Sequence, residues 1–326
     1  MKLSIVIPIF NERASLPELY RRVRAVLDGM PAIEHRVIYV NDGSTDGSLE
    51  VMLDQQREDP RFTVIDLSRN FGQQAAIAAG LAAADGDAAV VMDGDLQDPP
   101  ELIAEMVECW RGGAEVVRAE RRSREERGVR RWSFDRFYDV LGWVADFPIP
   151  AHVGVFGLLD RKALDELIRL PERNRFLPGL RAWIGFQQRT VYYDRRERAS
   201  GVPKQSFSRL LRYGLDGVFS FSYKPLRLMV AAGILISSMG FVLASAFVIK
   251  RLSGVETAQT GFTTLVTLVL FLGGVQLVAI GLLGEYLGRI YDEVKQRPLY
   301  IVKRRFPEGP PERPRPADAA GRSVED

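Results

Sequence analysis

Short apolar runs alternate with segments of helical spacing in the first part of the chain, up to about residue 120. The runs are rich in Val and Ile without strict polar alternation, as expected for strands that are covered on both faces. We predict strands at Leu3–Ile9, Arg36–Val40, Phe62–Leu67, Ala88–Met92 and Glu115–Val117. We predict helices at Leu16–Leu27, Gly47–Gln56, Gln73–Ala83 and Pro100–Arg111, the first with Ser15 as its N-cap. This alternation predicts an α/β fold with a Rossmann-like, doubly wound, mostly parallel sheet.

Polar residues gather directly after three of the predicted strands. The strands end in Pro8-Ile9-Phe10-Asn11-Glu12, in Asn41-Asp42-Gly43-Ser44 and in Asp93-Gly94-Asp95-Leu96-Gln97. Each cluster alone is also typical of a turn or a cap. Because ligands bind beyond the carboxyl ends of parallel strands, three acidic strand ends on one rim indicate a binding site.

The carboxylates of Asp93 and Asp95 are separated by one residue, and their like charges repel unless a cation lies between them. Mg²⁺ or Mn²⁺ is the natural partner, because these ions combine few carboxylates with substrate phosphates. Gln97 is a candidate for a further oxygen ligand. The implied substrate is a diphosphate-linked donor. We find neither a Walker A loop nor Gly-x-Gly-x-x-Gly, so nucleotide hydrolysis and dinucleotide redox chemistry are disfavoured.

Two long segments without a charged residue, Leu228–Ile249 and Phe262–Gly284, predict a pair of transmembrane helices. At about 1.5 Å per residue each spans roughly 33 Å, enough for a hydrocarbon core of about 30 Å. The segment between them is short, so they form a hairpin. Basic residues flank its outer ends, which places both termini in the cytoplasm and the protein in the cell inner membrane as a multi-pass protein.

An apolar stripe with interspersed basic residues precedes the hairpin and predicts an amphipathic helix at the membrane surface. We therefore divide the chain into an α/β domain at 1–205, an interfacial helix at 206–227, the hairpin at 228–284 and a basic, Pro-rich tail at 285–326. The net charge of +2 does not indicate a nucleic-acid binder. Small residues in the first span, Gly233, Ser237 and Gly240, leave a homo-oligomer possible.

The strand-end sequences, together with Asn70-Phe71-Gly72-Gln73 and Asp98-Pro99-Pro100-Glu101, resemble the family-2 polyprenyl-phosphate glycosyltransferases. That family includes bactoprenol-phosphate glucosyltransferases and dolichol-phosphate mannose synthases. Phe221-Ser222-Tyr223-Lys224-Pro225 ahead of the hairpin resembles the bactoprenol branch. The resemblance implies a GT-A-type fold and an inverting transfer of a hexose, glucose from UDP-glucose, to undecaprenyl phosphate.

The same resemblance implies roles for individual residues. Asp93 and Asp95 would be the catalytic carboxylates, with Asp93 contacting nucleotide or metal and Asp95 and Gln97 holding the metal. Residues for the nucleoside would be Pro8, Asn11, Glu12 and Asp42. Residues for the acceptor phosphate would be Arg121, Arg122, Arg124, Arg175 and Lys204. For the other arginines between Arg118 and Arg136, a membrane-surface role is an equally simple explanation.

The segments that would bind the acceptor depart from the family pattern. Gly154-Val155-Phe156-Gly157 stands where the family commonly has Gly-Asp-Phe-Arg, and Pro203-Lys204 stands in place of Ser-Lys. His152 lies nearby as a candidate substitute for the missing acidic residue. Two alternatives therefore stay open. One keeps the donor site but uses another lipid or glycan acceptor, and the other is a non-catalytic membrane partner that binds nucleotide sugar.

Overall fold

The computed structural model describes residues 1–121, 153–173, 175–193, 224–253 and 261–307, which fall into two compact units. Unit 1 comprises Met1–Asp95 and the C-terminal segment that starts at Tyr300. Unit 2 comprises Leu96–Leu299.

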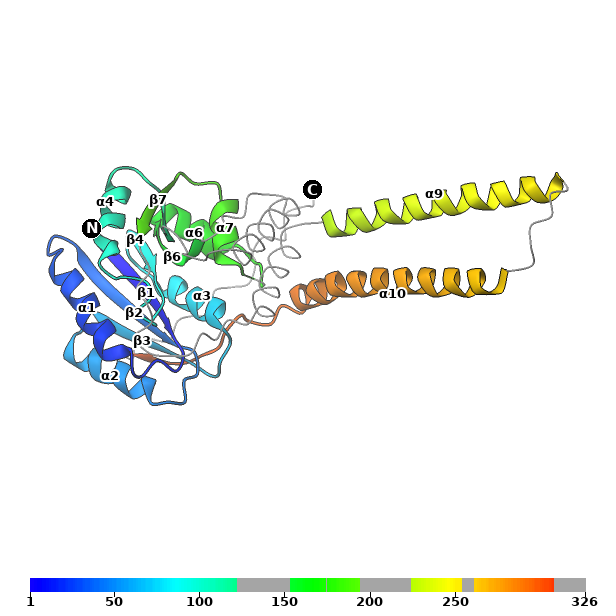
Figure 1. Cartoon of the computed structure of the whole chain (residues 1–326). Coiled ribbons are helices and arrows are strands. Elements are labelled where there is room, and N and C mark those ends of the chain that lie inside the picture. The colour runs from blue at the N-terminus through cyan, green and yellow to red at the C-terminus, as the bar shows by residue number, and fades with distance from the viewer. Residues whose placement is uncertain (122–152, 174, 194–223, 254–260, 308–326) are drawn as a thin grey trace, which may run out of the picture. The chain divides into compact units, whose positions relative to one another are not determined.

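Unit 1 contains a sheet with the strand order β4-β1-β2-β3-β8 (Figure 1). Pairing is parallel between β1 and β2, between β1 and β4 and between β2 and β3, as the sequence predicts. The elements are β1 (Lys2–Ile9), α1 (Leu16–Asp28), β2 (Glu34–Asn41), α2 (Ser48–Glu58), β3 (Phe62–Leu67), α3 (Gln73–Ala83), β4 (Ala88–Val91) and β8 (Val302–Phe306). The predicted strands and helices of this part are confirmed, with ends that differ by at most two residues.

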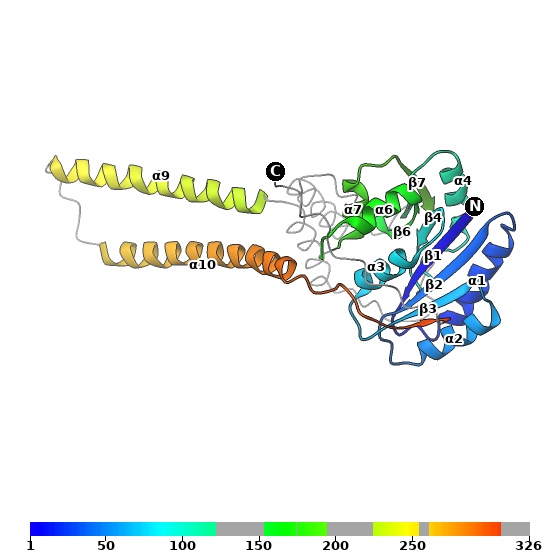
Figure 2. The ribbon, with the colours of Figure 1, turned by 180° about the vertical axis from the view of Figure 1, so that it is seen from behind.

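The order of the strands decides which face each helix covers. The chain steps outward from β1 to β3 through α1 and α2, and then returns past β1 to β4 through α3. Right-handed crossovers therefore put α1 and α2 on one face and α3 on the other, as Figures 1 and 2 show. Helix α3 lies very close to the sheet, since a Cβ atom at Gly80 would come within 2.2 Å of Val6 Cγ1.

The start of α1 differs from the prediction in its capping. Ser15 precedes the helix as predicted, but its side chain makes no cap hydrogen bond to the helix backbone. Its hydroxyl instead donates to Glu12 Oε2 at 2.9 Å, and its own backbone is already helical. Ser15 therefore occupies the N-cap position as predicted, but its hydroxyl bonds to Glu12 and not to the helix backbone.

Strand β8 comes from the segment that the sequence analysis assigned to the basic tail. It pairs antiparallel with β3, with Ile65 opposite Arg305 and Leu67 opposite Val302. The N–H of Ser68 also donates to the carbonyl of Ile301 at 2.9 Å. A short segment beyond the predicted hairpin, Val302–Phe306, thus extends the sheet of unit 1, which the charge-rich composition of β8 does not reveal.

Unit 2 contains a smaller set of strands with the order β7-β5-β6, in which β5 is antiparallel to β6 and parallel to β7. Asp160, at the end of β6, accepts hydrogen bonds from Trp110 Nε1 and from the N–H of Lys162, and so caps the next helix. The elements are α4 (Leu102–Arg111), β5 (Val116–Arg121), β6 (Val153–Asp160), α6 (Arg161–Arg169), α7 (Leu177–Trp183), β7 (Gln188–Tyr193), α9 (Lys224–Leu252) and α10 (Gly261–Val294).

Helices α9 and α10 are long and apolar enough to cross a membrane over Lys224–Leu243 and Phe271–Val294, with mean hydropathies of 2.0 and 1.5. Their large apolar side chains are exposed, for example Phe241 at 75% and Leu277 at 72%. Such surfaces are stable only in an apolar environment. These two helices therefore form the membrane-associated part of the chain (Figure 1). Most of the predicted interfacial helix, up to residue 223, lies outside the described residues.

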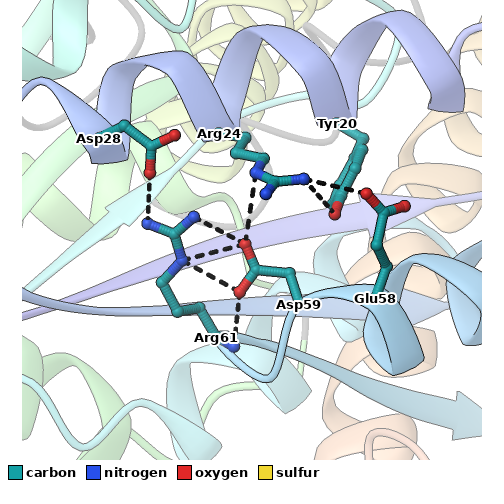
Figure 3. A network of polar contacts seen from close by, with 6 residues as sticks. All are labelled: Tyr20, Arg24, Asp28, Glu58, Asp59 and Arg61. Atoms are coloured by element: carbon teal, nitrogen blue, oxygen red, sulfur yellow. Dashed lines mark hydrogen bonds and ion pairs between the residues drawn. The ribbon is translucent and has the colours of Figure 1, made fainter.

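A network of ion pairs joins the ends of α1 and α2 to the start of β3 in unit 1 (Figure 3). Arg61 Nη2 lies 2.7 Å from Asp59 Oδ2, and Arg61 Nη1 lies 2.8 Å from Asp28 Oδ1. Arg24 Nη1 lies 2.9 Å from Glu58 Oε1. Burial by itself raises the pKa of Asp59, but hydrogen bonds from the side chain and the N–H of Arg61 outweigh it, so the pKa is lower than usual.

This network gives a prediction for stability. Arg61→Met leaves the buried Asp59 carboxylate without its main cation, and we expect a loss of about 1–3 kcal/mol in the free energy of unfolding. Because the pKa of Asp59 is lowered in the folded protein, its stabilising contribution is present at neutral pH and is lost as the pH falls below about 4. The matched control is Arg57→Met, whose ion pair with Asp54 is exposed at 72% on both sides. Thermal unfolding of the detergent-solubilised chain measures both variants, and equal melting temperatures would contradict the prediction.

Candidate active site

The carboxyl ends of β1 and β2 in unit 1 are joined by hydrogen bonds between their loops. The N–H of Asn11 donates to Ser44 Oγ at 3.1 Å, and Asn11 Oδ1 accepts from the N–H of Thr45 at 2.9 Å. The N–H of Glu12 donates to Ser48 Oγ at 3.1 Å. Asn11 adopts a left-handed φ of 55°, a conformation that Asn tolerates better than most residues. The predicted nucleoside residues Asn11 and Glu12 thus lie beside the β2 end.

Asp42 connects the end of β2 to the loop after β3. It is only 2% exposed. Its Oδ1 accepts from the N–H of Phe71 at 2.7 Å, and its Oδ2 accepts from the N–H of Gly72 at 2.9 Å. Burial raises the pKa of Asp42, and the two N–H donors and nearby Arg69 offset this only in part. Asp42 therefore fixes the position of the Asn70–Gln73 loop, a role that the sequence analysis did not assign to it.

Gly43 brings the same two loops into direct contact. Its φ is +69°, and a Cβ atom here would lie 2.5 Å from the backbone nitrogen of Asn70. Only glycine permits both this conformation and this approach. The polar sequences after β2 and β3 are thus packed against each other.

The predicted catalytic carboxylates follow β4 directly. Asp93 Oδ1 accepts from Gln73 Nε2 at 2.6 Å, so the first turn of α3 orients this carboxylate. Asp93 and Asp95 are both half-buried, while Gly94 between them is buried. A Cβ atom at Gly94 would lie 2.4 Å from Ile9 Cδ1. The glycine between the two acids therefore accommodates the Ile9 side chain.

A divalent cation fits this pair of carboxylates. Both are partly accessible, and Mg²⁺ and Mn²⁺ bind through one or two carboxylates together with phosphate oxygens and water. Within the ranges that the structure describes, no three His, Cys, Asp or Glu side chains form a complete protein-built metal cage. The donor set thus suits a metal whose coordination is completed by a bound diphosphate. Gln97 is only 5% exposed, and its role as a ligand stays a prediction.

The residues predicted for the acceptor phosphate are only partly described. Arg121 ends β5, while Arg122, Arg124 and Lys204 lie outside the described residues. Arg175 belongs to the loop before α7, where Nε and Nη2 donate to the carbonyls of Glu172 and Leu170. Their role at the acceptor stays a prediction.

The structure gives a physical reason for Gly157, one of the departures from the family pattern. A Cβ atom at Gly157 would lie 2.5 Å from the carbonyl oxygen of Val117 and 2.6 Å from Arg181 Nη1. Arg181 is 1% exposed, and its Nη2 donates to the carbonyl of Gly154 at 2.6 Å. The Arg181 guanidinium, from α7, thus lies where a side chain at position 157 would begin. Val155 is 7% exposed and packs as an apolar residue, and His152 lies outside the described residues.

Sequence reasoning gave no role to Gln73 or Arg181. Gln73 belongs to a quoted sequence of the family, but its hydrogen bond to Asp93 spans 20 residues and depends on how α3 meets β4. Arg181 lies in a segment without a recognisable motif. For Gln73, the sequence offers only its distance along the chain from Asp93, and this distance does not predict a contact.

The chain thus combines acidic residues at the carboxyl ends of a parallel sheet with two helices that are long and apolar enough to cross a membrane. Residues 4–168 match the family described as Glycosyl transferase family 2, and residues 224–290 match the GtrB C-terminal hairpin. The chain therefore belongs to glycosyltransferase family 2, and its catalytic part has the GT-A-type fold that the sequence predicts.

The relatives of this chain are similar over nearly their whole length. A protein of Synechocystis sp. that is named an uncharacterized glycosyltransferase is 43% identical over 93% of this chain and 95% of its own. The prophage-derived bactoprenol glucosyl transferase of Shigella flexneri is 39% identical over 93% of this chain and 98% of its own. Among solved structures, a mannosyltransferase of Pyrobaculum calidifontis in complex with GDP-Man and Mn²⁺ is 14% identical and covers 85% of this chain and 86% of its own, with a TM-score of 0.43.

The contact at Gly43 gives a prediction for the rim. Gly43→Ala forces the β2 and β3 loops apart, and we expect weaker nucleotide binding together with a lower melting temperature. Gly113→Ala is the matched control, because Gly113 also has a positive φ, of +93°, but has open space around it. Calorimetric titration with UDP and Mn²⁺ measures the first effect. Equal UDP affinity in the two variants would show that the contact does not shape the site.

Proposed function

We propose that this protein transfers a hexose, glucose from UDP-glucose, to undecaprenyl phosphate with inversion at the anomeric carbon. One observation carries the proposal: the acidic strand-end rim and the apolar hairpin occur in one chain that is 39% identical to a bactoprenol glucosyl transferase over 93% of its length. The family membership supports the class of reaction. The donor nucleotide, the acceptor lipid and the inversion are the proposal's own.

In this proposal the donor lies at the carboxyl ends of β1, β2 and β4 in unit 1. Pro8, Asn11, Glu12 and Asp42 border the nucleoside. Asp42 also keeps the adjoining loop in place through the N–H groups of Phe71 and Gly72. Asp93 and Asp95 hold the divalent cation, with Gln97 as a further candidate ligand. When bound, Mg²⁺ or Mn²⁺ neutralises charge on the departing diphosphate. Gln73 keeps the Asp93 carboxylate oriented for this role.

The acceptor phosphate needs orientation more than deprotonation. A phosphate monoester is largely ionised at pH 7, so its oxygen is already nucleophilic, and alignment and charge compensation supply the main catalytic effect. We assign the compensation to Arg121, Arg122, Arg124, Arg175 and Lys204. The buried Val155 is consistent with a mechanism that uses no carboxylate at this position.

We further propose that the protein is a multi-pass protein of the cell inner membrane with both termini in the cytoplasm. Basic residues such as Arg289, Lys295 and Arg297 follow the second apolar stretch, while Lys250 and Arg251 are the only basic residues that flank the short connection. The positive-inside rule favours this orientation. Both substrates are then reached from the cytoplasmic leaflet.

The direct test is transfer from radiolabelled UDP-glucose to undecaprenyl phosphate with Mg²⁺, with the lipid product identified by mass. We expect product with the unmodified chain and a loss of at least about a hundredfold with Asp95→Asn, since a metal ligand is removed. Asp54→Asn, which changes an exposed carboxylate on α2, is the control and should keep full activity. If no common nucleotide sugar yields a lipid-linked product, the proposed function is wrong.

A second candidate keeps the donor site and uses another lipid or glycan acceptor. Two observations favour this candidate: Val155 is buried, and the Arg181 guanidinium lies beside Gly157. Both differ from the family pattern in the segment that would contact the acceptor. Competition between undecaprenyl phosphate and other acceptors separates the two candidates. A further alternative, binding of nucleotide sugar without turnover, is excluded if activity is detected and vanishes with Asp95→Asn.

A further inference from the structure

The chain directly after the catalytic carboxylates has an unusual backbone. Leu96 has a φ of +63°, which a side chain with a Cβ atom rarely adopts. This backbone conformation lowers the stability of the folded protein by on the order of 1–3 kcal/mol. It therefore persists only where surrounding contacts hold the residue in place. Leu96 follows Asp95 directly, so its conformation sets the direction in which the chain leaves the catalytic pair.

A buried hydrogen bond fixes this segment two residues further on. Asp98 is 2% exposed, and its Oδ1 accepts from the Tyr193 hydroxyl at 2.8 Å, across 95 residues of sequence. A hydrogen bond from a hydroxyl to a carboxylate is stronger than one between neutral groups, and more so away from water.

Tyr193 is itself held from two directions within unit 2. It is the last residue of β7 and pairs with Arg121 of β5 in the parallel ladder. Its ring packs edge-on against Phe156 of β6, with centroids 6.1 Å apart and an interplanar angle of 80°. It is 6% exposed. The hydroxyl therefore presents a fixed donor to Asp98.

We infer that Tyr193 is a positioning residue for the metal-binding carboxylates, acting through Asp98 and the left-handed turn at Leu96. This inference rests on the proposed function. The bond to Tyr193 holds Asp98, and it therefore restricts the movement of Leu96 and Gln97, the two residues between Asp98 and Asp95. If the hydrogen bond between Tyr193 and Asp98 contributed only to stability, its removal would lower the melting temperature but leave the affinity for the metal unchanged.

Tyr193→Phe tests the inference, because it removes the hydroxyl and keeps the ring against Phe156. We expect the full chain in detergent to bind Mn²⁺ about tenfold more weakly in the presence of UDP, as measured by electron paramagnetic resonance. The KM for Mn²⁺ in the transfer assay should rise by a similar factor. The matched control is Tyr192→Phe on the same strand, whose side chain is 51% exposed and which should bind Mn²⁺ like the unmodified chain.

Asp98 supplies a second pair of variants. Asp98→Asn keeps an oxygen acceptor for the Tyr193 hydroxyl and should lose less Mn²⁺ affinity than Asp98→Ala. The double variant Asp98→Ala with Tyr193→Phe should be no weaker than Asp98→Ala alone, because both remove the same bond. If Tyr193→Phe does not fold, the comparison of Asp98→Asn with Asp98→Ala decides the question.

The inference is overturned if folded Tyr193→Phe binds Mn²⁺ with the affinity of Tyr192→Phe, or if Asp98→Asn and Asp98→Ala bind it equally. A failure of the proposed function is distinguishable from this result. In that case the unmodified chain itself shows neither Mn²⁺ binding with UDP nor transfer.

Discussion

The proposed donor site depends on one buried carboxylate. Asp42 at the end of β2 accepts the N–H groups of both Phe71 and Gly72, and it is 2% exposed. An N–H group left without an acceptor would lower the stability of the protein by about 1–3 kcal/mol. The carboxylate therefore holds the loop after β3 in place. That loop leads into α3, and Gln73 at the start of the helix orients Asp93. A single side chain, that of Asp42, thus connects the polar loops after β2 and β3, and Gln73 links the second of them to Asp93 after β4.

Long-range polar contacts of the same kind recur where the chemistry requires a fixed loop. Asn11 ties the β1 end to the β2 end, and Asp98 ties the chain after the catalytic pair to Tyr193. The parallel sheet brings the strand ends to one edge, but it does not determine the conformation of the loops. The hydrogen bonds of Asn11 and Asp98 supply that order.

Much of the fold follows from local patterns in the sequence. The Val- and Ile-rich runs and the helical spacing locate the elements of unit 1, because burial on both faces imposes that composition. The apolar stretches locate α9 and α10 for a similar reason. Strand β8 was not predicted, because Lys303, Arg304 and Arg305 are typical of a charged tail. An edge strand such as β8 can form through backbone pairing alone, whatever its side chains. Ser15 occupies the predicted N-cap position of α1, but the contact of its hydroxyl with Glu12 is not visible in a helix-start pattern.

The sequence also predicts part of the candidate site. Asp42, Asp93 and Asp95 are recognisable from their positions after strands, but the partners of Asp42 and the role of Gln73 depend on how neighbouring loops pack. The space at Gly157 depends on Arg181, 24 residues further along, and no local pattern links the two. The sequence therefore indicates the candidate acids, and the tertiary structure identifies what holds them.

The most direct test of this account is calorimetric titration of UDP, with Mn²⁺ present, into the unmodified chain and into Asp42→Asn. The account predicts binding by the unmodified chain and an affinity at least about tenfold lower in the variant, because one N–H of the loop loses its acceptor and the other loses a charged one. Equal UDP affinities in two folded proteins would contradict it.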